Sequence, residues 1–287
     1  MSRCTPYEAA KAVHGIYIPP FRFPDWVLDP GLWSTFQFAD TRVFYHKEDT
    51  YEDVLAMVKG REPCNIGMSP LFNIQKMEDA FGYSKGAYGR STPEKLMPNI
   101  GVYCKATLNL NGIYRLAHVL NLVGVAFDAS SQPDYQYFEN RPNADIVAKY
   151  SEIWKLALKA ATTIPGIKTL QIYNVGGGAF AGKFESTFSA EIFEPAFKPL
   201  LSAFQENRIQ VEGYDWIHHT FNSGYIPDCL YSDDLESTLY INAWDPWSLI
   251  GNGNERDASL DGHWGRISNM AVLGWWQTNP HMKFISV

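Results

Sequence analysis

Three aspartates and an asparagine surround a glycine-rich segment in the last fifty residues of the chain. An apolar run of strand character ends with Asn242 and Asp245. The segment Gly-Asn-Gly-Asn follows at residues 251–254, and then come Asp257 and Asp261. A strand that ends in polar side chains and opens into a glycine loop is typical of a ligand site at the carboxyl end of a sheet. Carboxylates in such a site can orient water or stabilise a developing positive charge.

A second glycine-rich segment, Gly-Gly-Gly-Ala-Phe-Ala-Gly at residues 176–182, follows an apolar run and precedes a helical pattern. Glycines in that position allow backbone N–H groups to approach a diphosphate without obstruction by side chains. The spacing fits neither a P-loop, although Lys183 comes next, nor the dinucleotide-binding fingerprint. A tight turn without a ligand is the alternative interpretation, as capping and turn formation are for the three aspartates.

From residue 101 onward, apolar strands alternate with amphipathic helices. Strands are predicted at residues 101–110, 114–122, 168–175, 208–212 and 239–243, and helices at residues 143–162 and 189–207. The apolar run of the second strand continues to Phe127, ahead of Asp128. Pro195 and Pro199 should distort the second helix, because each removes a backbone donor and crowds the preceding turn. This alternation predicts an α/β fold whose mostly parallel sheet is covered on both faces.

Composition limits the domain organisation and the class of partner. Residues 1–100 are rich in proline, glycine and aromatic residues, which predicts an irregular elaboration packed on an α/β core of residues 101–287. The chain is 46% hydrophobic and 19% charged, so its 287 residues can bury a sizeable core. The formal net charge is −7 with dispersed lysines and arginines, which argues against a nucleic-acid partner.

The four cysteines are widely spaced and indicate neither a zinc site nor a disulfide framework. No stretch reaches the roughly 20 apolar residues of a membrane span, and the N-terminus lacks the pattern of a signal peptide. We therefore expect a cytoplasmic protein that uses neither a metal nor a cofactor and does not enter a membrane.

The two glycine segments resemble those of the macrodomain superfamily of ADP-ribose-binding proteins and ADP-ribosyl hydrolases. The family pattern has a strand ending V-N-A-A-N, a glycine loop and a V-D-G that opens a helix, to which residues 241–245, 251–254 and 260–262 are similar. The family's phosphate-binding loop is similar to residues 176–182. The order is rearranged here, because the asparagine-bearing strand follows the phosphate loop. The resemblance implies a macrodomain-like, mixed, mostly parallel sheet flanked by helices.

The resemblance also implies an activity and assigns residues to it. The chain would bind ADP-ribose and remove it from an ADP-ribosylated protein, with arginine as the modified side chain if the resemblance to the divergent MavL-like branch holds. Asp261 is implied to position or activate water, while Asp257 and Asp245 suit a cationic guanidinium leaving group. The implied ligand-binding residues are Asn242 and Phe180 for the distal ribose, Gly176, Gly177, Gly178, Ala179 and Gly182 around the diphosphate, Gly251, Asn252, Gly253 and Asn254 in the second loop, and Asp128 near the adenine or the rim.

Two other functions remain open from the sequence. In a non-catalytic ADP-ribose reader, the same loops bind the ligand and the aspartates only accept hydrogen bonds from ribose hydroxyls. In a glycosidase, two carboxylates act on a sugar while aromatic residues stack against it.

Overall fold

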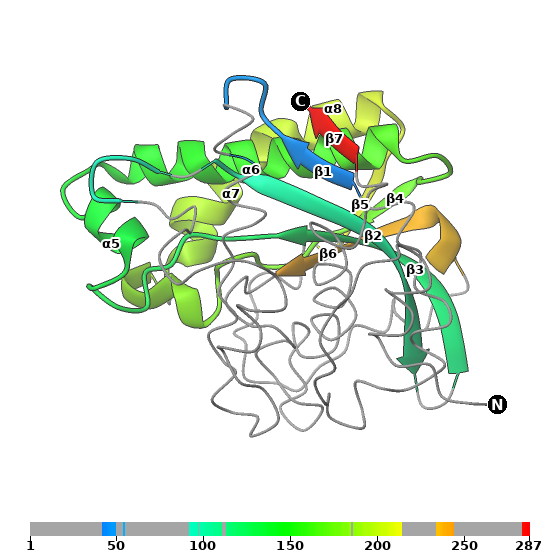
Figure 1. Ribbon diagram of the computed structural model, residues 1–287, viewed down its shortest axis with the longest axis horizontal. Helices are drawn as coiled ribbons and strands as arrows, with labels where there is room; N and C mark the ends of the chain where they lie inside the picture. The colour runs from blue at the N-terminus through cyan, green and yellow to red at the C-terminus, as the bar shows by residue number, and fades with distance from the viewer. Residues whose placement is uncertain are drawn as a thin grey trace, which may run out of the picture.

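A single mixed sheet runs through the described part of the protein (Figure 1). The computed structural model describes residues 42–49, 54, 92–96, 98–110, 113–184, 186–213, 234–243 and 283–287. Its strands are β1 (Arg42–Tyr45), β2 (Ile100–Leu110), β3 (Ile113–Leu122), β4 (Thr169–Gln171), β5 (Gln210–Glu212), β6 (Thr238–Ala243) and β7 (Lys283–Ser286). Its helices are α5 (Pro133–Phe138), α6 (Asn143–Thr163), η3 (Ala179–Phe184), η4 (Ser189–Phe193), α7 (Glu194–Phe197), η5 (Lys198–Leu200), α8 (Leu201–Glu206) and η8 (Leu235–Ser237).

The seven described strands lie in the order β5-β4-β6-β3-β2-β1-β7. The pairs β5 with β4, β4 with β6, β6 with β3, and β1 with β7 are parallel. Only β2 runs antiparallel to its two neighbours, β1 and β3. The predicted α/β class with a mixed, mostly parallel sheet is therefore confirmed. β1 comes from the segment before residue 100, so the sheet includes a strand from the region that the sequence separates from the core.

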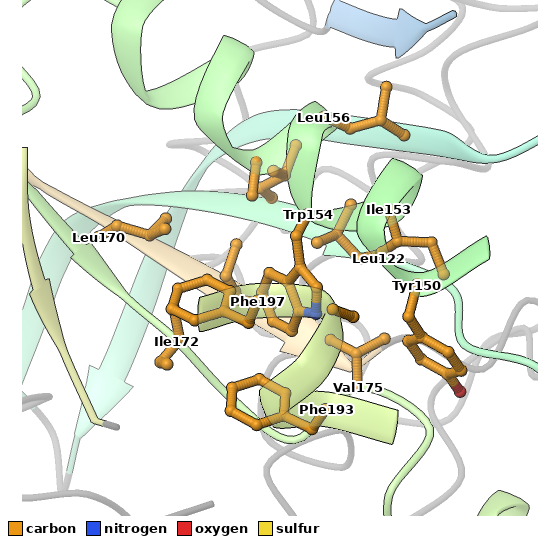
Figure 2. Close-up of a cluster of buried hydrophobic side chains, with 14 of the residues drawn as sticks. Leu122, Tyr150, Ile153, Trp154, Leu156, Leu170, Ile172, Val175, Phe193 and Phe197 are labelled. Carbon is orange, nitrogen blue, oxygen red and sulfur yellow. The ribbon is translucent and has the colours of Figure 1, made fainter. Parts of the chain in front are cut away.

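Helix α6 packs one apolar stripe against the strands β1, β2 and β3. Its buried residues recur at helical spacing and are Ile146, Tyr150, Ile153, Trp154, Leu156, Ala157, Ala160 and Ala161. The helix lies close to the sheet at Gly101 of β2, where an added Cβ would lie 3.6 Å from Cβ of Leu156 on α6. Figure 2 shows Trp154 pointing from α6 toward the rings of Phe193 and Phe197.

The opposite face of the sheet is buried as well. Val43, Val54, Ile100 and Val102 form a second apolar cluster, and each is at most 2% exposed. Side chains alternate between the two faces of a strand, so burial of both Val43 and its neighbour Phe44 requires cover on both sides. The predicted covering of both faces is confirmed for this part of the sheet.

The helix predicted at residues 189–207 is broken into four short pieces. A π-helical turn (η4) leads into α7, then into the 3₁₀ turn η5 and finally α8. Pro195 and Pro199 lie in the first turns of α7 and η5, where a missing backbone N–H is tolerated. The apolar stripe survives these breaks, because the ring of Phe197 stacks on those of Phe193 and Phe204. The prediction of distortion by the prolines is confirmed.

β4 ends earlier than the sequence predicts, whereas β3 ends where it was predicted to end. β4 stops at Gln171, and the backbone N–H of Ile172 still donates to the carbonyl of Glu212 before the chain leaves the sheet. β3 stops at Leu122, so the apolar residues that follow it belong to a loop. These residues are apolar because the loop packs on the core, and not because they pair with a neighbouring strand. None of the helices described combines the length with the apolar character that crossing a membrane requires.

Candidate functional site

Three parallel strands bring their carboxyl ends to one edge of the sheet. β6 lies between β3 and β4, with Leu122 opposite Ala243 and Gln171 opposite Tyr240. Two segments leave the sheet at this edge: residues 123–128 after β3, here called the β3 loop, and residues 176–182 after β4, here called the glycine loop. In open α/β sheets, ligands bind at such carboxyl edges.

The β3 loop and the glycine loop touch each other. The backbone N–H of Phe127 donates to the carbonyl of Phe180 at 2.8 Å. A Cβ on Gly182 would lie 1.9 Å from the carbonyl oxygen of Phe127, and a Cβ on Gly124 would lie 2.6 Å from Cα of Gly176. Since neighbouring strands are about 4.8 Å apart, β3 and β4 are separated by about 10 Å, and their loops must lean toward one another across β6 to meet. Glycine at these positions is what permits the contact.

The hydroxyl of Tyr150 lies beneath the point where the two loops meet. It accepts the backbone N–H of Val125 at 3.0 Å, and a Cβ on Gly176 would come within 2.1 Å of it. Gly176 also has φ of +77°, a conformation that other residues rarely adopt. Tyr150 is fully buried, and burial raises its pKa above the ordinary range, so the hydroxyl stays neutral. One side chain of α6 therefore supports both loops.

A group of partly buried charges anchors the β3 loop from behind. The backbone N–H of Ala126 donates to Oδ2 of Asp134 at 3.2 Å. Burial lowers the pKa of Lys149 to about 8, while the negative charges of Asp134, Asp49 and Glu152 act in the opposite direction. Burial likewise raises the pKa of Asp49, although His46 and Lys149 oppose that shift. The loop is thus tied to α5 and, through these charges, to α6.

Two charged side chains belong to this edge. Asp128 closes the β3 loop and is exposed, with its backbone N–H facing Gly182, where an added Cβ would lie 3.1 Å away. Lys183 follows Gly182 and is also exposed. Its ammonium lies over the rings of Phe127, Tyr135 and Phe184 at 5.6, 5.5 and 5.0 Å from their centroids.

The structure brings together only part of the site that the sequence predicts. The residues Gly176, Gly177, Gly178, Ala179, Phe180 and Gly182 lie in the glycine loop, next to Asp128 at the end of the β3 loop. Asn242 lies on β6, opposite Asn121 of β3, and so at the same edge. The remaining predicted residues lie outside the described ranges: Asp245, Gly251, Asn252, Gly253, Asn254, Asp257 and Asp261.

Sequence reasoning missed the residues that hold the loops. Tyr150 belongs to the apolar stripe of α6, and nothing in that periodicity distinguishes a tyrosine whose hydroxyl accepts a loop N–H from an ordinary core ring. Gly124 interrupts an apolar run, a signal that can indicate a close backbone approach. Asp134 lies in the first turn of α5, a helix that was not predicted from the sequence and where acidic residues are common.

The arrangement can hold a polar ligand through backbone groups and one cation. No family model matches the chain, and no curated protein matches it. Within the described ranges, no group of three or more His, Cys, Asp or Glu side chains is placed to hold a metal ion. At this edge lie the backbone amides of the glycine loop, of which those of Gly177 and Ala181 donate to nearby carbonyls, together with an exposed carboxylate at Asp128 and an exposed ammonium at Lys183. These groups suit recognition of an anion joined to a hydrogen-bonding moiety, such as a nucleotide.

Proposed function

We propose that this protein binds ADP-ribose at the carboxyl edge of β3, β6 and β4 and hydrolyses its bond to a modified protein side chain, with arginine as the expected linkage. In this proposal the glycine loop binds the diphosphate, Asn242 contacts the distal ribose and Asp128 lies on the adenine side. The segment of residues 251–254 is assigned to bind another part of the ligand. Phe180 lies against the distal ribose.

One observation carries the proposal. In the sequence, residues 176–182 precede the Asn242 strand, which is the reverse of the order in the family that they resemble. In the structure β6 inserts between β3 and β4, so the glycine loop, the β3 loop and Asn242 share one edge. Ligand recognition depends on where residues lie in space and not on their order in the chain. A rearranged order can therefore still produce the same spatial arrangement of binding residues. This proximity supports a nucleotide site in which the loops after β3 and β4 hold one ligand.

The proposed chemistry follows from the bond to be broken. Cleavage between the anomeric carbon and the guanidinium nitrogen develops oxocarbenium character on the ribose. A water oxygen bonds to the anomeric carbon and loses a proton, the carbon–nitrogen bond breaks with its electron pair moving to nitrogen, and the leaving guanidine takes up that proton to depart as guanidinium. Asp261 is assigned to orient that water and accept its proton. Asp245 and Asp257 are assigned to stabilise the positive charge and hold the guanidinium.

A non-catalytic reader is the rival proposal, and one pair of measurements separates the two. Calorimetric titration with ADP-ribose tests binding, and incubation with arginine-linked ADP-ribosylated protein tests release of free ADP-ribose. Binding with release supports the hydrolase, whereas binding without release supports the reader. Carbohydrate binding without any response to ADP-ribose would instead favour the glycosidase.

Asp261→Asn is the decisive variant. We expect it to reduce ADP-ribose release by about a hundredfold or more, the usual scale for losing a general base, while the dissociation constant for ADP-ribose changes little. Asp145→Asn on α6 is the matched control, because it makes the same charge change in a surface pair with Arg141 far along the chain from the site. Unchanged release by Asp261→Asn would contradict the assignment of this residue.

A further inference from the structure

Lys183 has an environment that distinguishes it from an ordinary surface lysine. It directly follows Gly182, whose φ is +49° and whose missing side chain leaves room for the carbonyl of Phe127. The contact between Gly182 and Phe127 therefore positions the Lys183 backbone at the junction of the glycine loop and the β3 loop. The direction in which this lysine leaves the chain is set by the same contact that joins the two loops.

Three aromatic rings from different elements surround the Lys183 ammonium. Phe127 comes from the β3 loop, Tyr135 from α5 and Phe184 from η3, and each ring centroid lies within 5.6 Å of Nζ. Ring faces attract a cation but do not neutralise its charge. Lys183 makes no ion pair with any carboxylate in the described part of the chain. Its N–H donors and its full positive charge are thus available to an anion.

The charges of the β3 loop, of the glycine loop and of the residues that flank the glycine loop also favour an anionic ligand. Residues 123–128 and 172–184 contain one cationic side chain, Lys183, and one anionic side chain, Asp128. The whole chain has a net charge of −7, which opposes the approach of an anionic ligand. A cation at the loop junction offsets this repulsion locally. Because the aromatic rings already hold the Lys183 ammonium, less side-chain entropy is lost when it binds an anion.

We propose that the Lys183 ammonium binds the diphosphate of the ligand at the junction of the glycine loop and the β3 loop. This inference rests on the proposed function, since it names the contact that selects a nucleoside diphosphate over an uncharged nucleoside. The loop amides contribute hydrogen bonds from the glycine side, and Lys183 contributes the charge. Lys183 is therefore a specificity residue and takes no part in bond cleavage.

Calorimetric titration of ADP-ribose into three lysine variants tests the inference. Lys183→Ala should raise the dissociation constant about fivefold to tenfold, the scale of one charge-assisted contact at a partly exposed site. Lys183→Arg should stay near the wild type because it keeps the charge. Lys198→Ala is the matched control, since Lys198 is exposed on η5 and its loss changes the net charge equally.

Fragments of ADP-ribose show which part of the ligand Lys183 contacts. Competition experiments should show that ADP loses as much affinity as ADP-ribose in Lys183→Ala, whereas adenosine loses none. The affinity of the wild type should also fall more steeply with salt than that of Lys183→Ala. Equal dissociation constants for wild type and Lys183→Ala, or an equal loss for adenosine, would overturn the inference while leaving the proposed function intact. If the wild type binds no ADP-ribose at all, the proposed function fails and the inference fails with it.

Discussion

The α6 core and the loop junction are held together by different physical means. Between α6 and the helices η4 and α7, stabilisation comes from the packing of large side chains: Trp154 meets Phe193 and Phe197 edge to face, and these two rings stack on each other. At the junction of the β3 loop and the glycine loop it comes from a few directional contacts, including the hydrogen bond between Phe127 and Phe180. The stabilisation of the core is distributed over many atomic contacts. The contact between the two loops instead requires glycine, which has no side chain, at a few positions.

Because of this difference, we expect changes in the core and changes at the junction to affect stability and ligand binding to different extents. A core change should lower the free energy of unfolding with little effect on the ligand edge, provided that the protein remains folded. A junction change should alter ligand binding more than its stability cost would suggest. Tyr150 belongs to both regions, because its ring packs on Phe188 in the core while its hydroxyl supports the loops.

The largest stability effect is expected for Trp154→Ala. Trp154 is fully buried and contacts Phe193 and Phe197, so the truncation should reduce the free energy of unfolding by about 3 to 5 kcal/mol. Chemical denaturation followed by circular dichroism measures this loss. Trp154→Phe should cost much less, because it keeps most of the apolar ring and removes an indole N–H that finds no acceptor among the described residues. Equal losses in the two variants would show that aromatic volume does not hold this core.

The next largest effect is expected for Gly176→Ala. The new Cβ would fall 2.1 Å from the Tyr150 hydroxyl, so the two loops should separate and ADP-ribose binding should weaken by at least about tenfold. Gly166→Ala is a matched control: Gly166 has a similar φ of +86° but no atom within 4 Å of the added Cβ. The control should lose about 1 kcal/mol of stability from backbone strain alone, with normal binding.

The second-site change Tyr150→Phe sharpens this test. By itself it leaves the Val125 N–H without its acceptor, which should cost about 1 to 3 kcal/mol. In the Gly176→Ala background it also removes the atom that the new methyl group meets, so the double variant should be more stable than the sum of the two losses predicts. Simple additivity in a double-mutant cycle of unfolding free energies would contradict direct contact between Tyr150 and Gly176.

The smallest effect concerns pH and the charges behind the β3 loop. Burial lowers the pKa of Lys149 to about 8, so between pH 8 and the ordinary lysine value the unfolded chain binds more protons than the folded one. Stability should therefore rise with pH in this window, by at most about 1.4 kcal/mol per pH unit from this group. Below pH 8 the contribution should be constant.

Comparison with Lys149→Met isolates this contribution, because the variant has no group that titrates in the window. The difference in unfolding free energy between wild type and variant, followed from pH 7 to pH 10, should move in favour of the wild type. A difference that is independent of pH would show that folding does not change the pKa of Lys149.

Much of the fold follows from periodicity, as particular elements illustrate. The spacing of Ile146, Tyr150 and Trp154 predicts the buried face of α6, and the prolines predict the breaks between residues 189 and 206. The end of β4 was harder to predict, because the apolar residues that follow it pack as a loop and look like a continued strand. β1 was not recognised as part of the sheet, since four residues carry too little pattern to reveal a partner distant in the sequence.

The sequence by itself determined the α/β class, the apolar face of α6 and the presence of a glycine loop after a strand, because these depend on residue types that recur at short, regular spacing. Only the tertiary structure decided that β6 inserts between β3 and β4, and that Gly124 meets Gly176 above the Tyr150 hydroxyl. Strand order and loop contact arise from pairing between residues far apart in the chain. Such pairing is selected by the packing of the whole sheet, for which local spacing carries no signal.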